Sequence, residues 1–432
     1  KGNYKKEFIS NANLKKISAI ITEKKIDLNV PQIIVSDVQI ALAILSREWF
    51  GNPQKKLKII GITGTKGKTS AAYILFNLLQ HQLGKRKIAL FSTVETFLGN
   101  DEKTKSHLTT PESYELFKNM KKAVDNGAEI LIMEVSSQAY LKNRVYGITF
   151  DVGMFLNISE DHIGPNEHKN FDDYLSKKQQ LAYNSKIMLV NNDSEYASKF
   201  LGIANKDITI GESNSEFTYQ ILKSNLEYSL FKINNQVYEL LIPGDFNVTN
   251  AVFAIVAAKC LGIDFNEKIL PIKNIPGRML EIKSENNGLI VIDYAHNYES
   301  LHRLLEFLKK NHPDGKVIVV LGSPGNKGTN RRSGFAKALD EFANIVFLTS
   351  DDPGFENPLD IANEIKRNIL NTKIKVEIEL DRRKAIYAAI GKSTNNDVVV
   401  LAAKGEDLFQ KINGVDTPYD GDYRIALNYL NK

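Results

Sequence analysis

Short apolar runs alternate with longer segments of mixed character over most of the chain, starting near Lys56. A short run that is apolar throughout predicts a buried strand, and an intervening segment such as 112–126 has the pattern of a helix. Strands that alternate with helices are typical of a mostly parallel sheet. We therefore expect an α/β protein whose first sheet contains strands at 57–63, 87–92, 129–135, 151–157 and 186–191.

The pattern changes in residues 217–242, where polar and apolar residues alternate with a period of two. Segments 217–221 and 238–242 have the spacing of half-buried strands, and Asn234-Asn235 favours a turn. We expect these two strands, joined through that turn, as an antiparallel addition to the first sheet. An apolar helix is expected after Gly244.

A second alternation of strands and helices begins near Leu289, which predicts a separate, Rossmann-like doubly wound domain. A chain of 432 residues is also too long for one hydrophobic core. We expect three domains: 1–56 as the remnant of a small leading domain whose first part is missing, 57–275, and 276–432. The strands expected in the last domain are 289–294, 316–321, 345–349, 374–379 and 397–402.

Composition narrows the class of protein further. A net charge of +5, with lysines scattered among Asp and Glu, predicts an ordinary solvated surface and gives no reason to expect nucleic-acid binding. The single Cys260 lies in an apolar helical segment, where it is expected to be a buried small hydrophobe. The sequence has no apolar stretch long enough for a membrane span and no signal peptide. These features predict a cytoplasmic protein without membrane insertion.

The most informative motif is Gly-Ile-Thr-Gly-Thr-Lys-Gly-Lys-Thr-Ser at 61–70, directly after an apolar strand and before a predicted helix at 70–83. Glycine-rich loops in this position bind phosphates through backbone N–H groups. Lys68 can reach the terminal phosphates of ATP, and Thr69 or Ser70 can offer a hydroxyl to Mg²⁺. A flexible turn with solvated lysines is disfavoured because strand, loop and helix follow in the required order. The predicted nucleotide loop comprises Gly64, Thr65, Lys66, Gly67, Lys68, Thr69 and Ser70.

Seven motifs in collinear order make the chain similar to the Mur ligase family, which adds amino acids to the cell-wall precursor UDP-N-acetylmuramate, and most similar to the members that add the third residue. The resemblance covers nearly the whole chain and implies a three-domain architecture. The motifs are Gly64-Thr-Lys-Gly-Lys-Thr-Ser, Thr109-Thr-Pro, Glu134-Val-Ser-Ser, Asn157-Ile-Ser-Glu-Asp-His, Gly244-Asp-Phe-Asn-Val-Thr-Asn, Pro276-Gly-Arg and Asp293-Tyr-Ala-His.

Two residues follow strands at the carboxyl edge of the predicted sheet, beside the phosphate loop. Glu134 ends the strand 129–133, where Mg²⁺ needs an acidic ligand, although a carboxylate facing water is the simpler alternative. His162 lies in a polar loop after another strand, and the resemblance implies that it is a second metal ligand. Thr69 would complete this part of the metal site.

The composition of the surrounding segment and the resemblance predict opposite environments for Lys178. It lies in a lysine-containing helical segment, which predicts a solvated surface residue. The resemblance implies instead that Lys178 is carbamylated by CO₂ and becomes a carboxylate-like ligand of Mg²⁺. The resemblance implies a lysine four residues after Tyr174, which favours Lys178 over the neighbouring Lys177.

The resemblance also assigns contacts to ATP and to the acceptor substrate. It implies that Asn247 and Asn250 contact the adenine, with a helix cap as the alternative for Asn247. Arg278 and Asp293 match further ATP contacts. The positions that hold the UDP-N-acetylmuramoyl dipeptide are Thr109, Thr110, Ser136 and Arg144, whose hydroxyls and guanidinium suit carboxylates and phosphates.

The amino-acid site departs from the best-known pattern of the family. Members that use meso-diaminopimelate carry Asp-Asn-Pro-Arg, whereas this chain has Asp351-Asp352-Pro353-Gly354. Loss of the arginine and gain of an acid favour a cationic side chain, so L-lysine fits better, while ornithine or another diamino acid stays open. Further candidates are Asp407 for the ammonium and Lys327 with Arg331 for the α-carboxylate, each with a solvated turn as the alternative.

The reaction implied is amide formation through an acyl phosphate, with Lys68, Lys178 and His162 as the catalytic set. The substrate carboxylate attacks the γ-phosphate of ATP, and the amine then displaces phosphate. A folylpolyglutamate synthetase-like ligase is disfavoured by Thr109-Thr-Pro and Asp351-Asp-Pro. A non-ligating P-loop ATPase subunit is disfavoured by the intact set of Glu134, His162 and Lys178.

Overall fold

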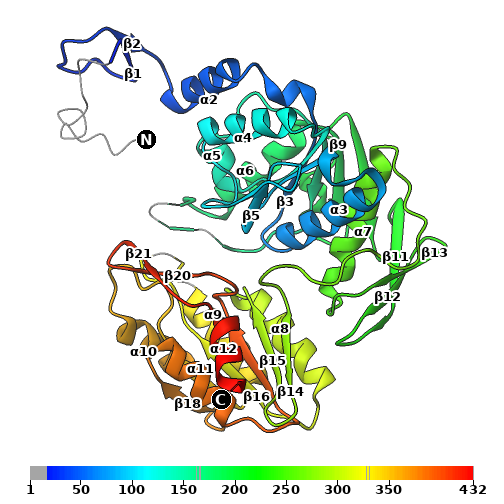
Figure 1. Ribbon diagram of the computed structural model, residues 1–432, viewed down its shortest axis with the longest axis vertical. Coiled ribbons are helices and arrows are strands. Elements are labelled where there is room, and N and C mark those ends of the chain that lie inside the picture. The colour runs from blue at the N-terminus through cyan, green and yellow to red at the C-terminus, as the bar shows by residue number, and fades with distance from the viewer. Residues whose placement is uncertain (1–16, 162, 165–166, 327, 330, 432) are drawn as a thin grey trace.

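The computed structural model describes residues 17–161, 163–164, 167–326, 328–329 and 331–431. Figure 1 shows a small N-terminal part, a central body and a C-terminal body in chain order. The N-terminal part has the short parallel pair β1 (Ile20–Thr22) and β2 (Gln32–Ile34), followed by α2 (Val38–Trp49). The three-part α/β arrangement agrees with the sequence prediction, and the boundaries predicted near residues 56 and 275 stay predictions.

The central sheet has eleven strands in the order β13-β12-β11-β10-β9-β8-β3-β7-β4-β5-β6. Its parallel middle contains all five strands predicted from apolar runs. Strands of a parallel sheet are covered on both faces, which explains why these runs are mostly apolar. The short edge strands β5 (Glu95–Phe97) and β6 (Lys103–Lys105) were not predicted. The five confirmed strands are β3 (Lys58–Thr63), β4 (Ile88–Phe91), β7 (Ile130–Glu134), β8 (Phe150–Phe155) and β9 (Ser185–Asn191).

The antiparallel addition is present but contains one strand more than predicted. After β10 (Lys206–Gly211) follow β11 (Phe217–Ser224), β12 (Ser229–Ile233) and β13 (Gln236–Leu240). Asn234-Asn235 therefore joins β12 to β13, and the prediction that it joins the 217–221 and 238–242 strands was wrong. The missed strand β12 buries alternate residues, as a half-buried strand does, but its Ser and Lys weaken the apolar pattern.

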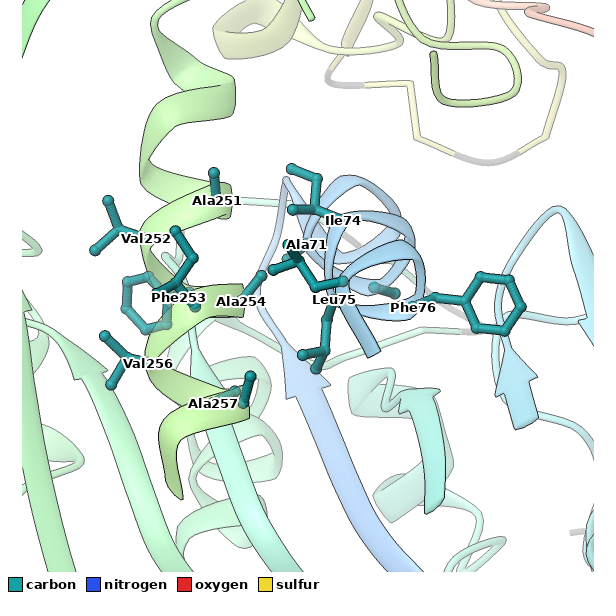
Figure 2. Packing of buried hydrophobic residues seen from close by; sticks show 14 of the residues in the cluster. Ala71, Ile74, Leu75, Phe76, Ala251, Val252, Phe253, Ala254, Val256 and Ala257 are labelled. Atoms are coloured by element: carbon teal, nitrogen blue, oxygen red, sulfur yellow. The ribbon is translucent and has the colours of Figure 1, made fainter. Parts of the chain in front are cut away.

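Helices α3 (Lys68–Leu83) and α7 (Phe246–Cys260) pack side by side above the central sheet. Figure 2 shows Ala254 and Ala257 of α7 pointing toward Ala71 and Leu75 of α3. Small side chains at this contact allow the two helices to approach closely, which brings the N-terminal turn of α7 beside the phosphate loop. Cys260 at the end of α7 is half-buried, and burial raises the pKa of its thiol.

Three helices cover the rest of the central body. They are α4 (Ser113–Asp125), α5 (Ser137–Leu141) and α6 (Phe171–Tyr183). Helix α4 confirms the helix predicted at 112–126. Among the described residues, no helix is long and apolar enough to cross a membrane.

The C-terminal body contains a six-stranded sheet in the order β14-β15-β19-β16-β17-β18. All its pairs are parallel except β14 with β15, and helices lie between the strands in the chain, so the Rossmann-like prediction is confirmed. The strands are β14 (Leu280–Ser284), β15 (Gly288–Asp293), β16 (Val317–Leu321), β17 (Ile345–Leu348), β18 (Lys375–Ile378) and β19 (Val398–Ala402). The helices are α8 (Tyr298–Asn311), α9 (Arg331–Phe342), α10 (Pro358–Asn368), α11 (Arg382–Gly391) and α12 (Asp422–Leu430).

A hairpin of β20 (Phe409–Ile412) and β21 (Val415–Pro418) extends from this body toward the central one in Figure 1. Lys105 of β6 lies over the ring of Phe409 in β20, 4.6 Å from its centroid. The hairpin was not predicted, and it brings the loop after β19 near the edge of the central sheet.

Candidate active site

The phosphate loop connects β3 to α3 at the carboxyl edge of the central sheet. Gly67 caps α3 with φ of 83°, and a Cβ there would lie 2.5 Å from Oδ1 of Asn250. Asn157 braces the loop, since its Oδ1 accepts from Lys66 N (2.9 Å) and its Nδ2 donates to Lys66 O (3.1 Å). Asn157 opens one of the motifs used above, but sequence reasoning gave it no role.

Two lysines converge on the same backbone carbonyl of this loop. Lys68 Nζ and Lys178 Nζ each donate to Gly64 O at 2.8 Å, and Lys68 also donates to Thr65 O at 3.1 Å. Burial lowers the pKa of Lys68. The structure therefore brings together two residues that lie far apart in the chain and were both predicted to act on phosphate or metal.

Lys178 is buried, so the prediction of a solvated surface residue from composition was wrong. Its residue is 2% exposed, and Nζ lies 4.7 Å from the centroid of the Tyr174 ring. The hydroxyls of Tyr174 and Thr65 are 3.0 Å apart, so α6 packs its Tyr174–Lys178 face beneath the phosphate loop. Burial and the nearby Lys68 ammonium hold the pKa of Lys178 well below its usual value.

Glu134 ends β7 and is 1% exposed, which excludes a carboxylate that merely faces water. Its Oε1 accepts from Thr69 Oγ1 at 2.9 Å and from Thr93 N at 2.8 Å, and its Oε2 accepts from Thr93 Oγ1 at 3.1 Å. Thr93 was missed, although it follows the neighbouring parallel strand β4 and so reaches the same edge of the sheet.

The predicted Mg²⁺ ligands provide only part of the oxygen coordination that a hard metal ion requires. Thr69 and Glu134 would supply oxygen ligands, and Lys178 would become an oxygen ligand only after modification. The predicted His162 lies outside the described residues. Within the described part of the chain, no group of three His, Cys, Asp or Glu side chains is placed to hold a metal.

Asp161 joins the central body to the C-terminal body. Its Oδ1 accepts from Arg331 Nη2 at 2.8 Å and Nε at 3.2 Å, and its Oδ2 accepts from Asn297 Nδ2 at 3.3 Å. Lys66 Nζ lies 3.6 Å from the same carboxylate and 3.1 Å from His296 Nε2. Asp161 and His296 belong to quoted motifs, but no pattern in the sequence indicated that they meet.

The predicted ATP contacts of the last two domains lie near this junction. Asn247 is not a helix cap, because Asp245 caps α7 and Asn247 Nδ2 donates to Pro243 O at 2.8 Å. Asn250 donates to Phe246 O at 3.1 Å. The Arg278 guanidinium lies 5.0 Å from the Tyr294 ring centroid.

Asp293 lies at the end of β15 beside the Arg278 segment. Its Oδ2 accepts from Met279 N at 2.9 Å, and burial raises the pKa of its carboxyl. The residue after it, Tyr294, donates its hydroxyl to Asp407 Oδ1 at 3.0 Å. Tyr294 therefore contacts both Arg278, assigned to ATP, and Asp407, assigned to the amino acid.

The four residues predicted to bind the acceptor are brought together around Thr110. Thr110 Oγ1 accepts from Ser136 N at 3.0 Å, and Thr110 O accepts from Arg144 Nη1 at 3.1 Å. Thr109 Oγ1 accepts from Thr93 Oγ1 at 3.1 Å, which links this group to Glu134. Arg144 is buried and paired with Glu112, so its guanidinium braces the loop in this structure.

The predicted amino-acid site contains a lysine that sequence reasoning missed. Lys404 Nζ lies 2.6 Å from Asp352 Oδ1, 3.4 Å from Asp351 Oδ1 and 4.0 Å from Asp407 Oδ2. Its position in the sequence, three residues before the predicted Asp407, was the available signal. The three predicted acids thus converge. Of the two cations predicted for the α-carboxylate, Arg331 faces Asp161 and Lys327 lies outside the described residues.

Comparisons with known proteins agree with this arrangement. Residues 62–258 match the Mur ligase middle domain, and residues 277–405 match the Mur ligase, glutamate ligase domain. A UDP-N-acetylmuramyl-tripeptide synthetase of Ligilactobacillus salivarius is 47% identical over 99% of this chain and 89% of its own. A UDP-N-acetylmuramoyl-L-alanyl-D-glutamate–L-lysine ligase of Enterococcus faecalis is 41% identical over 100% of this chain and 88% of its own.

Solved structures give the same fold. A UDP-N-acetylmuramoyl-L-alanyl-D-glutamate–2,6-diaminopimelate ligase superposes with a TM-score of 0.64 at 25% identity, covering 96% of this chain and 86% of its own. A folylpolyglutamate synthase of Mycobacterium tuberculosis has a TM-score of 0.68 at 16% identity, covering 85% of this chain and 92% of its own, which shows a shared fold alone. On the curated relatives and both family models, this chain belongs to the Mur ligase family.

Proposed function

We propose that the protein is an ATP-dependent ligase that adds L-lysine, as the third residue, to UDP-N-acetylmuramoyl-L-Ala-D-Glu in the synthesis of peptidoglycan precursors. Relatives named as tripeptide synthetases, which align over nearly the whole chain, support the third-residue ligation. The choice of L-lysine is carried by one observation: Asp351, Asp352 and Asp407 converge on Lys404 from two loops, one of which has Gly354 in place of an arginine.

The first step joins two anions, the dipeptide carboxylate and the γ-phosphate of ATP. The phosphates bind the loop 64–70, where backbone N–H groups and Lys68 at the N-terminus of α3 offset their charge. Lys68 is already beside this loop, so it exchanges its bonds to Gly64 O and Thr65 O for phosphate oxygens. Thr69, Glu134, His162 and modified Lys178 would hold Mg²⁺, which would supply further charge neutralisation.

Burial prepares Lys178 for carbamylation. Burial lowers the pKa of Lys178 and so favours the neutral amine, which is the form that attacks the carbon of CO₂ and then releases a proton. The product is a carboxylate-like anion within reach of the phosphate loop. Carbamylation therefore turns the Lys178 side chain into a counter-ion for the Lys68 ammonium, which favours metal binding beside the phosphate loop.

The second step brings the amine of the amino acid to the acyl phosphate. The acceptor is held near Glu134 by Thr109, Thr110, Ser136 and Arg144, and the loops of the C-terminal body carry the amine to it.

The nucleotide is held between the two bodies by Asn247, Asn250, Arg278 and Asp293. The contact of Asp161 with Arg331 keeps the two bodies together while water is excluded. Lys327 and Arg331 take the α-carboxylate, which requires Arg331 to divide its donors between Asp161 and the substrate.

We assign residues 57–275 to ATP binding, 276–432 to the amino acid, and 1–56 to the uridine end of the acceptor. The reaction consumes ATP and nucleotide-linked precursors, which places it in the cytoplasm. Nothing in the proposed chemistry calls for nucleic acid or for insertion into a membrane.

The test is phosphate release from ATP and Mg²⁺ with UDP-N-acetylmuramoyl-L-Ala-D-Glu, with L-lysine, ornithine and meso-diaminopimelate assayed in parallel. Release with L-lysine alone is the expected result. Release with meso-diaminopimelate would keep the ligase and refute the assignment drawn from Asp352 and Gly354. ATP turnover that no amine stimulates would favour a non-ligating ATPase, and turnover with a folate and L-glutamate would favour the folylpolyglutamate type.

A further inference from the structure

Lys404 is the buried centre of the acidic cluster formed by Asp351, Asp352 and Asp407. Its ammonium donates to Asp352 Oδ1 at 2.6 Å and lies within ion-pair distance of the other two carboxylates. The Lys404 side chain is 1% exposed, whereas Asp352 and Asp407 are 24% and 30% exposed. Lys404 therefore contacts the acids from the protein interior and leaves part of Asp352 and Asp407 facing outward.

The cluster keeps more negative than positive charge. Three carboxylates face the Lys404 ammonium, and the Arg382 guanidinium, which interacts with Asp351, makes two hydrogen bonds to Asp422 at 2.9 and 2.6 Å. Of two other neighbouring lysines, Lys105 lies over the Phe409 ring and Lys411 Nζ pairs with Asp416. A second ammonium is thus the group that the outward-facing oxygens of Asp352 and Asp407 are suited to bind.

The backbone conformations at Asp352 and beside Lys404 are unusual and indicate a ligand site. Asp352 has φ of 47° and Ala403, next to Lys404, has φ of 76°, both in the left-handed region that residues with a Cβ seldom adopt. Asp352 Oδ1 also accepts from Lys411 N at 2.9 Å, which ties it to the β20–β21 hairpin. Such conformations persist where surrounding contacts impose them, and they are concentrated at ligand sites.

We propose that Lys404 is a positioning residue that sets amino-acid specificity: it holds Asp352 and Asp407 from the buried side so that their outer oxygens bind the distal ammonium of a diamino acid. The inference rests on the proposed ligase function and deepens it. Lys404 does not contact the substrate, and it acts through the two carboxylates.

The experiment compares Lys404→Met with the wild type, measuring KM and kcat for L-lysine, ATP and the muramoyl dipeptide by phosphate release. Removing the ammonium frees the acids to separate, so the expected result is a KM for L-lysine raised about tenfold or more, with the other two KM values within about twofold. Preference for L-lysine over L-norleucine, which lacks the distal ammonium, falls in parallel. Lys404→Arg keeps a buried cation and restores part of the preference.

A double variant separates positioning from a general structural role. If Lys404 acts through Asp352, then Lys404→Met with Asp352→Asn has a KM for L-lysine close to that of the worse single variant. Asp352 is partly exposed, so Asp352→Asn alone also tests the cluster if Lys404→Met does not fold. Lys392→Met is the matched control, since this lysine pairs with Glu377 at the edge of the same body.

Three outcomes would overturn the inference. A lower KM for L-lysine in Lys404→Met would make Lys404 a competitor of the substrate ammonium, and equal changes in all three KM values would make it structural only. In both cases the wild type still turns over with L-lysine, so the proposed function stands. Absence of L-lysine turnover in the wild type is the distinct failure of the proposed function, and the inference fails with it.

Discussion

Arg331 of the C-terminal body donates two hydrogen bonds, at 2.8 and 3.2 Å, to Oδ1 of Asp161 in the central body. Both side chains are shielded, at 2% and 12% exposure, so solvent screens this pair less than it screens a surface pair. The pair lies beside Lys66 of the phosphate loop, and it thus couples the position of the C-terminal body to the nucleotide site.

Arg331→Met is therefore expected to impair closure of the two bodies. We expect kcat to fall by about 10- to 100-fold, which corresponds to about 1.4–2.8 kcal/mol of lost transition-state stabilisation. ATP binding by the central body should change little. Steady-state phosphate release together with nucleotide titration checks this, with Arg303→Met, at an exposed pair with Glu299, as the control. An unchanged kcat would remove the ion pair from the catalytic cycle.

Lys178→Ala is expected to abolish ligation while ADP still binds, because the phosphate loop keeps its backbone and Lys68. Bicarbonate or CO₂ added to the assay should not restore activity, since alanine has no amine to modify. Phosphate release and ADP titration are the measurements. Lys177→Ala, one residue away and half-buried, is the matched control and should stay active. Full activity of Lys178→Ala would remove Lys178 from the metal site.

The sequence predicts those parts of this fold whose physical signal is local. Strands β3, β7 and β8 are mostly apolar because both faces are covered, and the loop at 64–70 follows its strand directly. Strand β12 was missed because Ser229 and Lys232 interrupt its apolar pattern.

The remaining features depend on contacts between distant segments. Composition placed Lys178 on the surface, and only the packing of α6 beneath the phosphate loop buries it. Asp161 meets Arg331 across two domains, and Lys404 meets Asp352 across a sheet edge. The pattern of residues within one segment does not predict contacts with a distant segment. The resemblance could therefore name candidate residues, but it could not name their contact partners.

Gly67→Ala is expected to weaken both ATP binding and the folded state. The added Cβ would lie 2.5 Å from Asn250 Oδ1, and φ of 83° is unfavourable for alanine by about 1–2 kcal/mol. Thermal unfolding and ADP titration measure the two effects. In Gly67→Ala with Asn250→Ala the clash is relieved but the backbone strain remains, so stability should recover only in part. Gly262→Ala is a control with a similar φ of 79° and no atom near the added Cβ.

Lys66 should give the ligand-free protein a pH-dependent stability. Burial lowers the pKa of this lysine from 10.5 to about 7 in the folded state, despite the opposing Asp161 carboxylate. Between these values the unfolded chain binds the proton and the folded chain does not, so this group makes the free energy of unfolding rise with pH from about 7 toward 10.5. Lys66→Gln should flatten the rise in urea titrations at pH 7, 8 and 9, while Lys55→Gln, at an exposed position, should not. A slope unchanged in Lys66→Gln would assign the pH dependence to other groups, such as Lys68 and Lys178, whose pKa values burial also lowers.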